Sequence, residues 1–118
     1  MNFPADERKT DPAGPSVMVG WTTTEHRAQA ESLGRGLVEH GLVACAQISG
    51  PITSIYRWEG AVQAAEEYRL ILKFAAPREA EIEAWVHAHH PYAIPQWVCV
   101  AADGVSKNYL NWVMQTSS

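Results

Sequence analysis

The feature that most constrains the fold is a pair of long strand-like runs, residues 42–58 and 61–74, separated only by Glu59-Gly60. Both runs are rich in β-branched, aromatic and aliphatic side chains, which favour an extended backbone. The Glu-Gly pair suits a two-residue hairpin turn, although it is a weaker turn signal than Asn-Gly. The pattern therefore predicts an antiparallel hairpin whose strands are longer than a small flat sheet usually needs.

A strand and a helix are predicted before the hairpin. Residues 16–21 form a short apolar run of strand length. Thr22 is followed three residues later by Glu25, a capping box that predicts a helix start, and Gly41 marks the end of that helix. Further on, the Gly-Pro pair at 50–51 predicts a bend or bulge that interrupts the first hairpin run.

A second helix and another strand are predicted after the hairpin. Pro77 can begin a helix that Pro91 ends, and residues 96–102 are again strand-like. Ser106 can cap a short final helix. The order β-α-β-β-α-β plus a terminal helix is that of the ferredoxin-like α+β fold, with one antiparallel sheet and both main helices on one face.

The predicted sheet lacks a polar face. In the last strand, Trp97 and Cys99 alternate with Val98 and Val100, and residues 42–48 show the same two-sided apolar pattern. A monomer with helices on one face exposes the other face to water, and that face should then be polar. An uncovered apolar sheet face predicts association, most simply with another copy of the chain.

Size and composition predict one domain, residues 16–118, preceded by a short tail. The chain has 118 residues, of which 47% are hydrophobic, enough for a core of its own. Residues 1–15 contain three Pro, one Gly and five charged residues. Almost nothing in that stretch can pack, so the sequence predicts a disordered N-terminal tail.

Charge and cysteine content argue against several classes of protein. Nine Lys or Arg against thirteen Asp or Glu give a net charge of −4, so we expect no nucleic-acid partner. No apolar run approaches the roughly 20 residues of a membrane span, and the N-terminus lacks a secretory pattern. Cys45 and Cys99, each in an apolar run, fit reduced thiols. We therefore expect a cytoplasmic protein with no membrane partner.

Three histidines near the end of the second predicted helix are candidate metal ligands. Imidazole suits copper and zinc, so His89 and His90 can form a metal site. The alternative is structural: His89 packs on the apolar helix face, and His87 and His90 cap the helix C-terminus. Cys45 leaves a similar choice between a thiolate ligand and a small core side chain. We find no nucleophile-base pattern and no phosphate-binding loop, so we expect no enzymatic activity.

Five segments together resemble the CutA divalent-cation-tolerance family. They are LVACAQI (42–48), GPITSIYRWEG (50–60), EYRLILK (67–73), HHPYAIP (89–95) and YLNW (109–112). They follow the order and spacing of the family, and the resemblance covers nearly the whole predicted domain. It implies a ferredoxin-like homotrimer in which the long hairpin strands extend sheets between subunits.

The family resemblance also implies a function and a site. Members are described as proteins that bind divalent metals, copper especially, and are linked to metal tolerance. The resemblance places a polar set near a cleft between subunits, where it can hold a small anion or an ion, or form an ion pair that fixes the trimer. The set comprises Cys45, Glu67, Lys73, His90, Tyr92 and Tyr109. The alternative is a trimeric small-ligand or signalling module resembling the PII proteins, by analogy of fold alone.

The chain departs from the family pattern at several positions. Trp21 stands where some bacterial relatives carry a Cys proposed as a copper ligand, and Phe74 replaces a common Thr. Ala93 and Gln96 replace two acidic residues. The loss of a soft ligand and of negative charge predicts weaker copper binding than in relatives with the extra Cys.

Overall fold

The structure, a computed structural model, describes residues 16–117, so the predicted tail and Ser118 lie outside the described residues. It confirms the predicted order of elements, with one short 3-10 turn at Ala76–Arg78 before the second helix. The strands are β1 (Val17–Thr24), β2 (Cys45–Trp58), β3 (Ala61–Ala75) and β4 (Val98–Ala101). The helices are α1 (Arg27–Glu39), α2 (Glu79–His89) and α3 (Lys107–Thr116).

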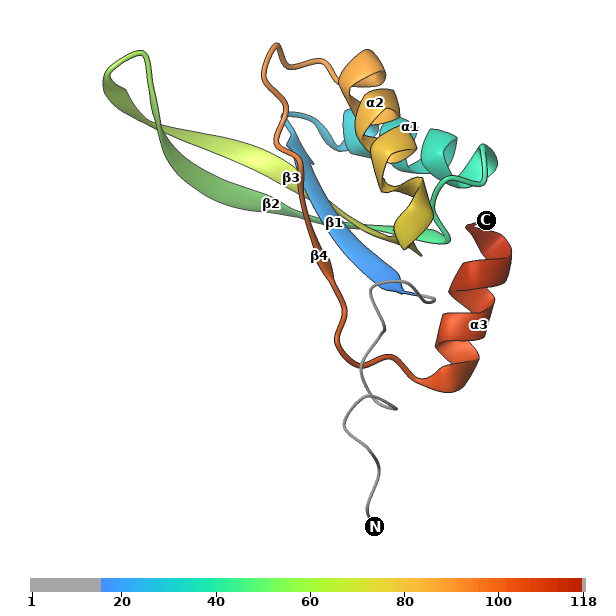
Figure 1. The fold of residues 1–118 in the computed structure, drawn as a ribbon. Coiled ribbons are helices and arrows are strands. Elements are labelled where there is room, and N and C mark those ends of the chain that lie inside the picture. Colours follow the sequence, from blue (N-terminus) through green and yellow to red (C-terminus); the bar gives the residue numbers. More distant parts are fainter. Residues whose placement is uncertain (1–15, 118) are drawn as a thin grey trace.

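One antiparallel sheet, in the order β2-β3-β1-β4, carries α1 and α2 on a single face (Figure 1), which confirms the ferredoxin-like α+β fold. The core lies between this face and the two helices. Its fully buried side chains include Leu70, Leu72 and Phe74 from β3, which face Leu37 and Val86 from the helices. Because every second residue of β3 is buried here, the residues between them point to the opposite face.

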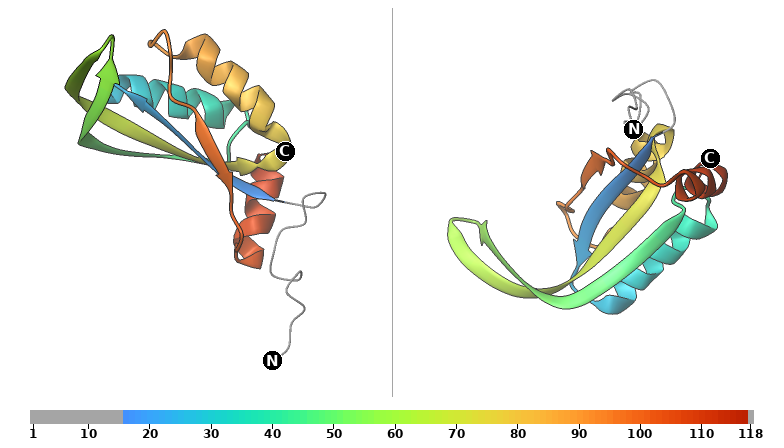
Figure 2. Two further views of the ribbon diagram at one scale, coloured as in Figure 1. Left: turned by 60° about the vertical axis from the view of Figure 1, so that its left-hand side comes forward. Right: turned by 90° about the horizontal axis from the view of Figure 1, so that it is seen from below.

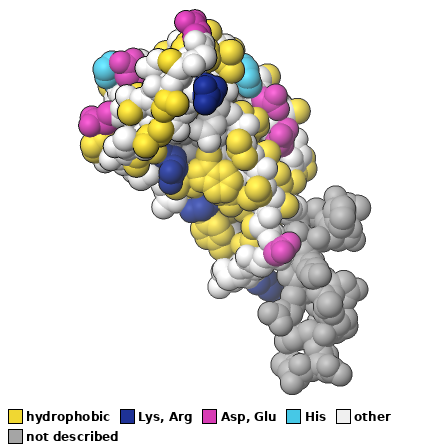
Figure 3. Space-filling view, turned by 90° about the vertical axis from the view of Figure 1, so that its left-hand side faces the viewer, with side chains coloured by type: hydrophobic (Ala, Val, Ile, Leu, Met, Phe, Trp, Pro, Cys, Tyr) yellow, Lys and Arg dark blue, Asp and Glu magenta, His cyan; other side chains and the backbone are white. Residues whose placement is uncertain are grey.

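That opposite face, which we call the open face, is covered by neither α1 nor α2. Val98 and Val100 of β4 point to it and are 50% and 48% exposed, whereas Cys99 between them packs against the core. Seen from the side of the hairpin, hydrophobic side chains gather in the middle of the molecule (Figure 3). The two-sided apolar character predicted for this strand is therefore confirmed.

The capping box predicted at Thr22 is wrong. β1 continues to Thr24, and α1 begins at Arg27 after the N-cap His26. Thr22 and Thr24 are fully buried, and Thr22 pairs with Leu70 in the sheet. Threonine is both a good N-cap and a good strand residue, and here sheet pairing decides. The helix instead starts with the His26 N–H donating to the Gln29 side chain at 3.0 Å.

Two predicted strands begin later than the sequence suggested. β2 starts at Cys45 rather than Leu42, because the N–H groups of Leu42 and Val43 donate to the Leu37 carbonyl at the end of α1. The Leu42 carbonyl accepts a hydrogen bond from the Ser117 hydroxyl at 2.8 Å. These buried residues are thus held by the two helices that flank them and not by a neighbouring strand.

β4 is likewise shorter than the predicted strand at 96–102 and spans only Val98–Ala101. Just before it, the Trp97 ring stacks on Phe74 with centroids 6.1 Å apart and lies against Gly20, where a Cβ would meet the ring at 2.8 Å. Trp97 therefore belongs to the core on the helix side of the sheet.

The hairpin of β2 and β3 curls beyond the rest of the sheet (Figure 2) and closes at the predicted turn. Glu59 and Gly60 have φ angles of 49° and 79°, the two positive values of a type I′ turn. The bulge predicted at the Gly-Pro pair is also present, as a register shift between Ser49 and Ile52. Beyond the shift, Ile52 pairs with Glu67, so residues 52, 54, 56 and 58 share the face of Glu67.

Gly50 makes this bulge sterically feasible, because its φ is 146° and a Cβ there would meet the Tyr68 ring at 2.8 Å. We expect Gly50→Ala to lower the free energy of unfolding by about 1–3 kcal/mol, the usual cost of such backbone strain. Gly104→Ala is the matched control, since a Cβ at Gly104 meets nothing within 4 Å. Chemical denaturation at one fixed protein concentration measures both, and equal stability of the two variants would contradict this account.

Candidate functional site

Six of the predicted site residues fall into two groups along β3, one around Glu67 in the middle of the strand and one around Lys73 near its C-terminal end, and His89 lies apart from both. Glu67 and Lys73 both point to the open face, six residues apart, which corresponds to roughly 20 Å along a strand. Glu67 takes part in none of the ion pairs formed within residues 16–117. One chain therefore keeps the carboxylate and the amine of the predicted set separate.

The first group is built around Glu67, a carboxylate with only 9% of its surface exposed. The Tyr92 hydroxyl, from the loop after α2, donates to Glu67 Oε2 at 2.8 Å. Burial, followed by the hydrogen bond and the negative charge of Glu67, raises the pKa of Tyr92 well above its ordinary value. Tyr92 therefore stays a neutral donor at any physiological pH.

His90 is locked into this first group by both of its ring nitrogens. Nε2 lies 2.8 Å from the Thr23 carbonyl, which can only accept, so Nε2 carries the proton. Nδ1 accepts the backbone N–H of Tyr92 at 3.0 Å. Burial is the main cause that lowers the pKa of His90 below 6.5, ahead of the opposing effect of the Thr23 hydrogen bond. His90 thus acts as a neutral clamp between β1 and the loop.

His89 lies in a different environment from His90. Its exposed ring stacks on Trp85 with centroids 3.9 Å apart, and its Nδ1 lies 2.8 Å from the Trp85 carbonyl. The proton is therefore on Nδ1, and Nε2 keeps its lone pair for a ligand. His87 makes the same kind of bond to the Glu83 carbonyl. Among residues 16–117, no cluster of three or more His, Cys, Asp or Glu side chains is arranged to hold a metal ion.

The second group lies near the C-terminal end of β3. Cys45 pairs with Lys73 across the sheet, and Cys45 Sγ lies 3.6 Å from the Tyr109 hydroxyl. Burial, with the Cys45 hydrogen bond next, raises the pKa of Tyr109 to about 12. The Lys73 ammonium donates to Gln47 Oε1 at 2.6 Å. Gln47 was not predicted, although its place two residues after Cys45 puts it on the same face.

A pocket of about 520 Å³ opens over Glu67 on the open face, and we call it the Glu67 pocket. Aromatic residues outside the predicted set line it, notably Tyr56 and Trp58, which are 43% and 46% exposed. The bulge was the signal that could have found them, because it sets which residues of β2 share a face with Glu67. The remaining lining residues are Thr23, Ser54, Tyr92, Ala93, Ile94 and Gln96.

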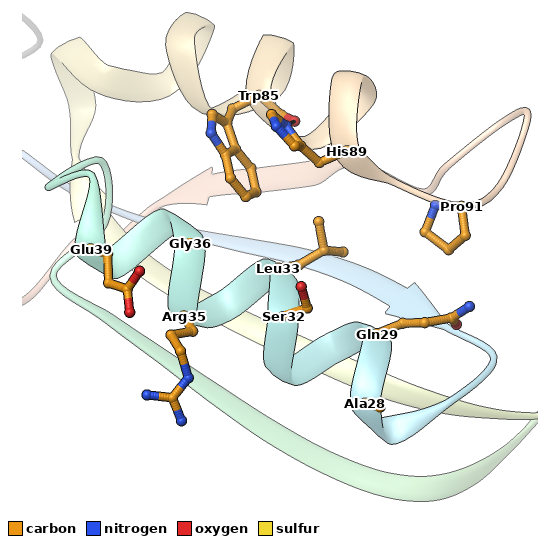
Figure 4. A pocket seen from close by; sticks show the side chains of 10 residues that line it. All are labelled: Ala28, Gln29, Ser32, Leu33, Arg35, Gly36, Glu39, Trp85, His89 and Pro91. Atoms are coloured by element: carbon orange, nitrogen blue, oxygen red, sulfur yellow. Dashed lines mark hydrogen bonds between the residues drawn. The ribbon is translucent and has the colours of Figure 1, made fainter.

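A second pocket, of about 620 Å³, lies between α1 and α2. Trp85 and His89 lie side by side over α1, whereas the Arg35 side chain points away from α2 (Figure 4). Trp85 approaches α1 at Gly36, where a Cβ would lie 2.6 Å from the indole ring. This groove has an apolar wall and presents His89 at its rim. No helix within residues 16–117 is long and apolar enough to cross a membrane.

The environment of His90 predicts a pH dependence of stability. The pKa of His90 is lower in the folded chain than the value of 6.5 in the unfolded chain. Its contribution to the free energy of unfolding is therefore complete at pH values above 6.5, and it is lost as the pH falls from 6.5 toward the folded-state pKa. We expect His90→Gln, which keeps a donor but does not titrate, to flatten the fall in unfolding free energy between about pH 7.5 and pH 5.

His40→Gln is the matched control for this experiment, because His40 is exposed and is not among the groups that shift the pKa of His90. Its denaturation curves should follow the wild-type pH dependence. Identical pH slopes for wild type and His90→Gln would rule out the clamp described above.

The chain is similar to proteins of one family over nearly its whole described length. The family model described as CutA1 divalent ion tolerance protein matches residues 18–116. The divalent-cation tolerance protein CutA of Thermus thermophilus is 33% identical over 88 residues, which cover 75% of this chain and 85% of that protein. The chloroplastic protein CutA of Arabidopsis thaliana is 32% identical over 103 residues, which are 87% of this chain but 56% of the plant protein. The chain thus spans little more than half of that relative.

Solved structures agree with the sequence comparison. The divalent cation tolerance protein of Thermus thermophilus matches with a TM-score of 0.84 and 30% identity, covering 86% of this chain and 99% of that one. CutA1 from Oryza sativa matches with a TM-score of 0.85 and 27% identity, covering 87% and 94% of the two chains. From these matches together, the chain belongs to the CutA1 family of divalent ion tolerance proteins.

Proposed function

We propose that this protein works without catalysis in the cytoplasm, as a homotrimer that binds a divalent cation, copper in particular. The observation that carries the metal proposal is the exposed His89 ring, whose Nε2 lone pair is available because Nδ1 donates to the Trp85 carbonyl. Copper stands near the top of the divalent affinity order for nitrogen ligands. Membership of a divalent ion tolerance family supports this choice of ligand.

His90 is the second ligand in this proposal, but it joins the metal only after losing a bond. Both of its ring nitrogens are engaged, with the Thr23 carbonyl and the Tyr92 N–H. Copper capture by the pair therefore opens the contact between β1 and the loop after α2, and that cost weakens binding. Because Trp21 is a donor-only side chain, it supplies no ligand in place of a thiolate.

The trimer proposal rests on two features of the sheet. Val98 and Val100 leave an apolar strip on the open face, and β2 offers a 14-residue strand edge with no partner within residues 16–117. A long free edge is a ready template for pairing with another chain. Assembly also offers a way to bring Lys73 of one copy toward Glu67 of the next, which one chain keeps apart.

Copper titration of histidine variants tests the metal proposal. We expect His89→Ala to weaken Cu²⁺ binding by more than about tenfold. A loss of about tenfold is already typical when only a residue that hydrogen-bonds to a metal ligand is mutated. His87→Ala is the control, because His87 is also exposed and makes the same Nδ1 bond to a helix carbonyl. Acid should weaken wild-type binding as imidazole protonates. If calorimetry gives the two variants equal affinities for Cu²⁺, His89 is not a metal ligand.

Light scattering tests the trimer. We expect Val100→Glu to shift the particle mass from three chains toward one chain of 13.0 kDa, since a charge would enter an apolar contact. Ala84→Glu on the exposed side of α2 adds the same charge outside the open face and should leave the trimer intact. A wild-type mass of one chain at micromolar concentration would refute the proposal.

The Glu67 pocket favours a second candidate function, a trimeric module that binds a small ligand in the manner of PII signalling proteins. Its volume of about 520 Å³ is in the range of small-molecule sites, and a buried carboxylate lies in its wall. This function needs no metal ligand, so it stands or falls independently of the copper titration.

A further inference from the structure

We infer that the Glu67 pocket is a site for a small organic ammonium ion. The inference rests on the second candidate above, that this pocket holds a ligand, and it adds the chemical class of that ligand. Three features of the pocket wall carry it: a buried carboxylate without a cationic partner among the described residues, three aromatic rings, and a lining in which the described residues supply no Lys, Arg or His side chain.

The carboxylate is the first feature. Glu67 is 9% exposed, and its charge is met by the neutral Tyr92 hydroxyl and by no ion pair within the described chain. Arg69 follows two residues along β3 on the same face, yet it forms no ion pair with Glu67. Glu25 adds to the negative field at Tyr92. A buried, unpaired carboxylate is costly, and a bound cation removes that cost.

The aromatic rings are the second feature. Tyr56, Trp58 and Tyr92 line the pocket together with Glu67. Neither Tyr56 nor Trp58 takes part in a ring stack or cation contact within residues 16–117, so no other ring of the described chain covers their faces. Aromatic rings that line one pocket with a carboxylate attract alkylammonium groups, because the ring faces are electron-rich and the cation is weakly hydrated.

The polar atoms of the wall argue against the other ligand classes. The Tyr92 hydroxyl donates to Glu67, and the Thr23 hydroxyl donates to Gln96 Oε1 at 3.3 Å. Among the described residues, no Lys, Arg or His side chain lines this pocket, and the Glu67 carboxylate would repel an anion. A divalent metal ion prefers several charged or imidazole ligands, and among the described residues Glu67 is the only His, Cys, Asp or Glu that lines this pocket.

The probe for this site is choline, compared with its uncharged carbon isostere 3,3-dimethylbutan-1-ol. In solutions of the whole protein, we expect the choline N-methyl proton signal to move upfield, because ring currents shield a group seated between aromatic faces. The isostere should bind at least about tenfold more weakly, since it lacks the charge that Glu67 recognises. Equal binding of the two compounds, or no shift of the choline signal at millimolar protein, would overturn the inference.

Two variants locate the binding. Glu67→Gln keeps an acceptor for Tyr92 but removes the charge, and Trp58→Leu removes one ring; each should weaken choline binding at least about tenfold. Trp112→Leu is the control for Trp58→Leu, because Trp112 is 44% exposed on α3 and lies outside the pocket. Choline affinity that is unchanged in Glu67→Gln would also overturn the assignment.

Light scattering on the same samples separates this inference from the trimer proposal. If the wild-type protein does not bind choline and the Glu67→Gln variant dissociates into single chains, the pocket is filled by a basic side chain of a second copy. The ammonium assignment is then wrong. If wild type binds choline but not copper, the metal proposal fails and the pocket assignment stands. A protein that binds choline in the Glu67-dependent way confirms the inference whatever its oligomeric state.

Discussion

The strict alternation of side chains along β3 is the constraint on which the rest of the molecule depends. Leu70, Leu72 and Phe74 are fully buried under the helices, so Glu67 and Lys73 must point to the open face. A slip of one residue would bury the charges and expose the core. β3 also pairs with both β1 and β2, so it fixes the register of the sheet and the position of both groups of polar residues.

The bulge in β2 is the second element of this arrangement. Near the C-terminal end of β3, Cys45 and Gln47 share a face with Lys73, whereas beyond the bulge the even-numbered residues of β2 share a face with Glu67. The change of parity comes from Gly50 and the residue after it, where the strand steps out of register. One glycine therefore decides that Tyr56 and Trp58, and not their neighbours, line the pocket.

Sequence reasoning reached the fold because the decisive signals were local. The Glu59-Gly60 turn, the bulge at Gly50 and the apolar helix face each depend on residues close together in the chain. The boundary at Thr22 failed because threonine serves both strands and caps, and only its pairing with Leu70 resolves the choice. Local pattern alone cannot rank two roles that one side chain fills equally well.

The site was less accessible because its contacts are long-range. His90 bonds to Thr23, 67 residues earlier, and Tyr92 bonds to Glu67, 25 residues earlier. Nothing in the run His87 to His90 distinguishes a clamped ring from a free one. The resemblance placed Glu67, Tyr92, Cys45 and Tyr109 in one set, and only the hydrogen bonds and the register divide that set into two groups and separate Lys73 from Glu67.

The stack of His89 on Trp85 makes the state of one imidazole optically visible. The two rings lie 3.9 Å apart and nearly parallel, so the indole emission senses any change in the charge of its neighbour. A protonated imidazole quenches indole fluorescence by withdrawing electron density from the excited ring, and a bound copper ion quenches that fluorescence more strongly. One of the five tryptophans of the chain thus serves as a fluorescent reporter at the groove between the helices, without an added dye.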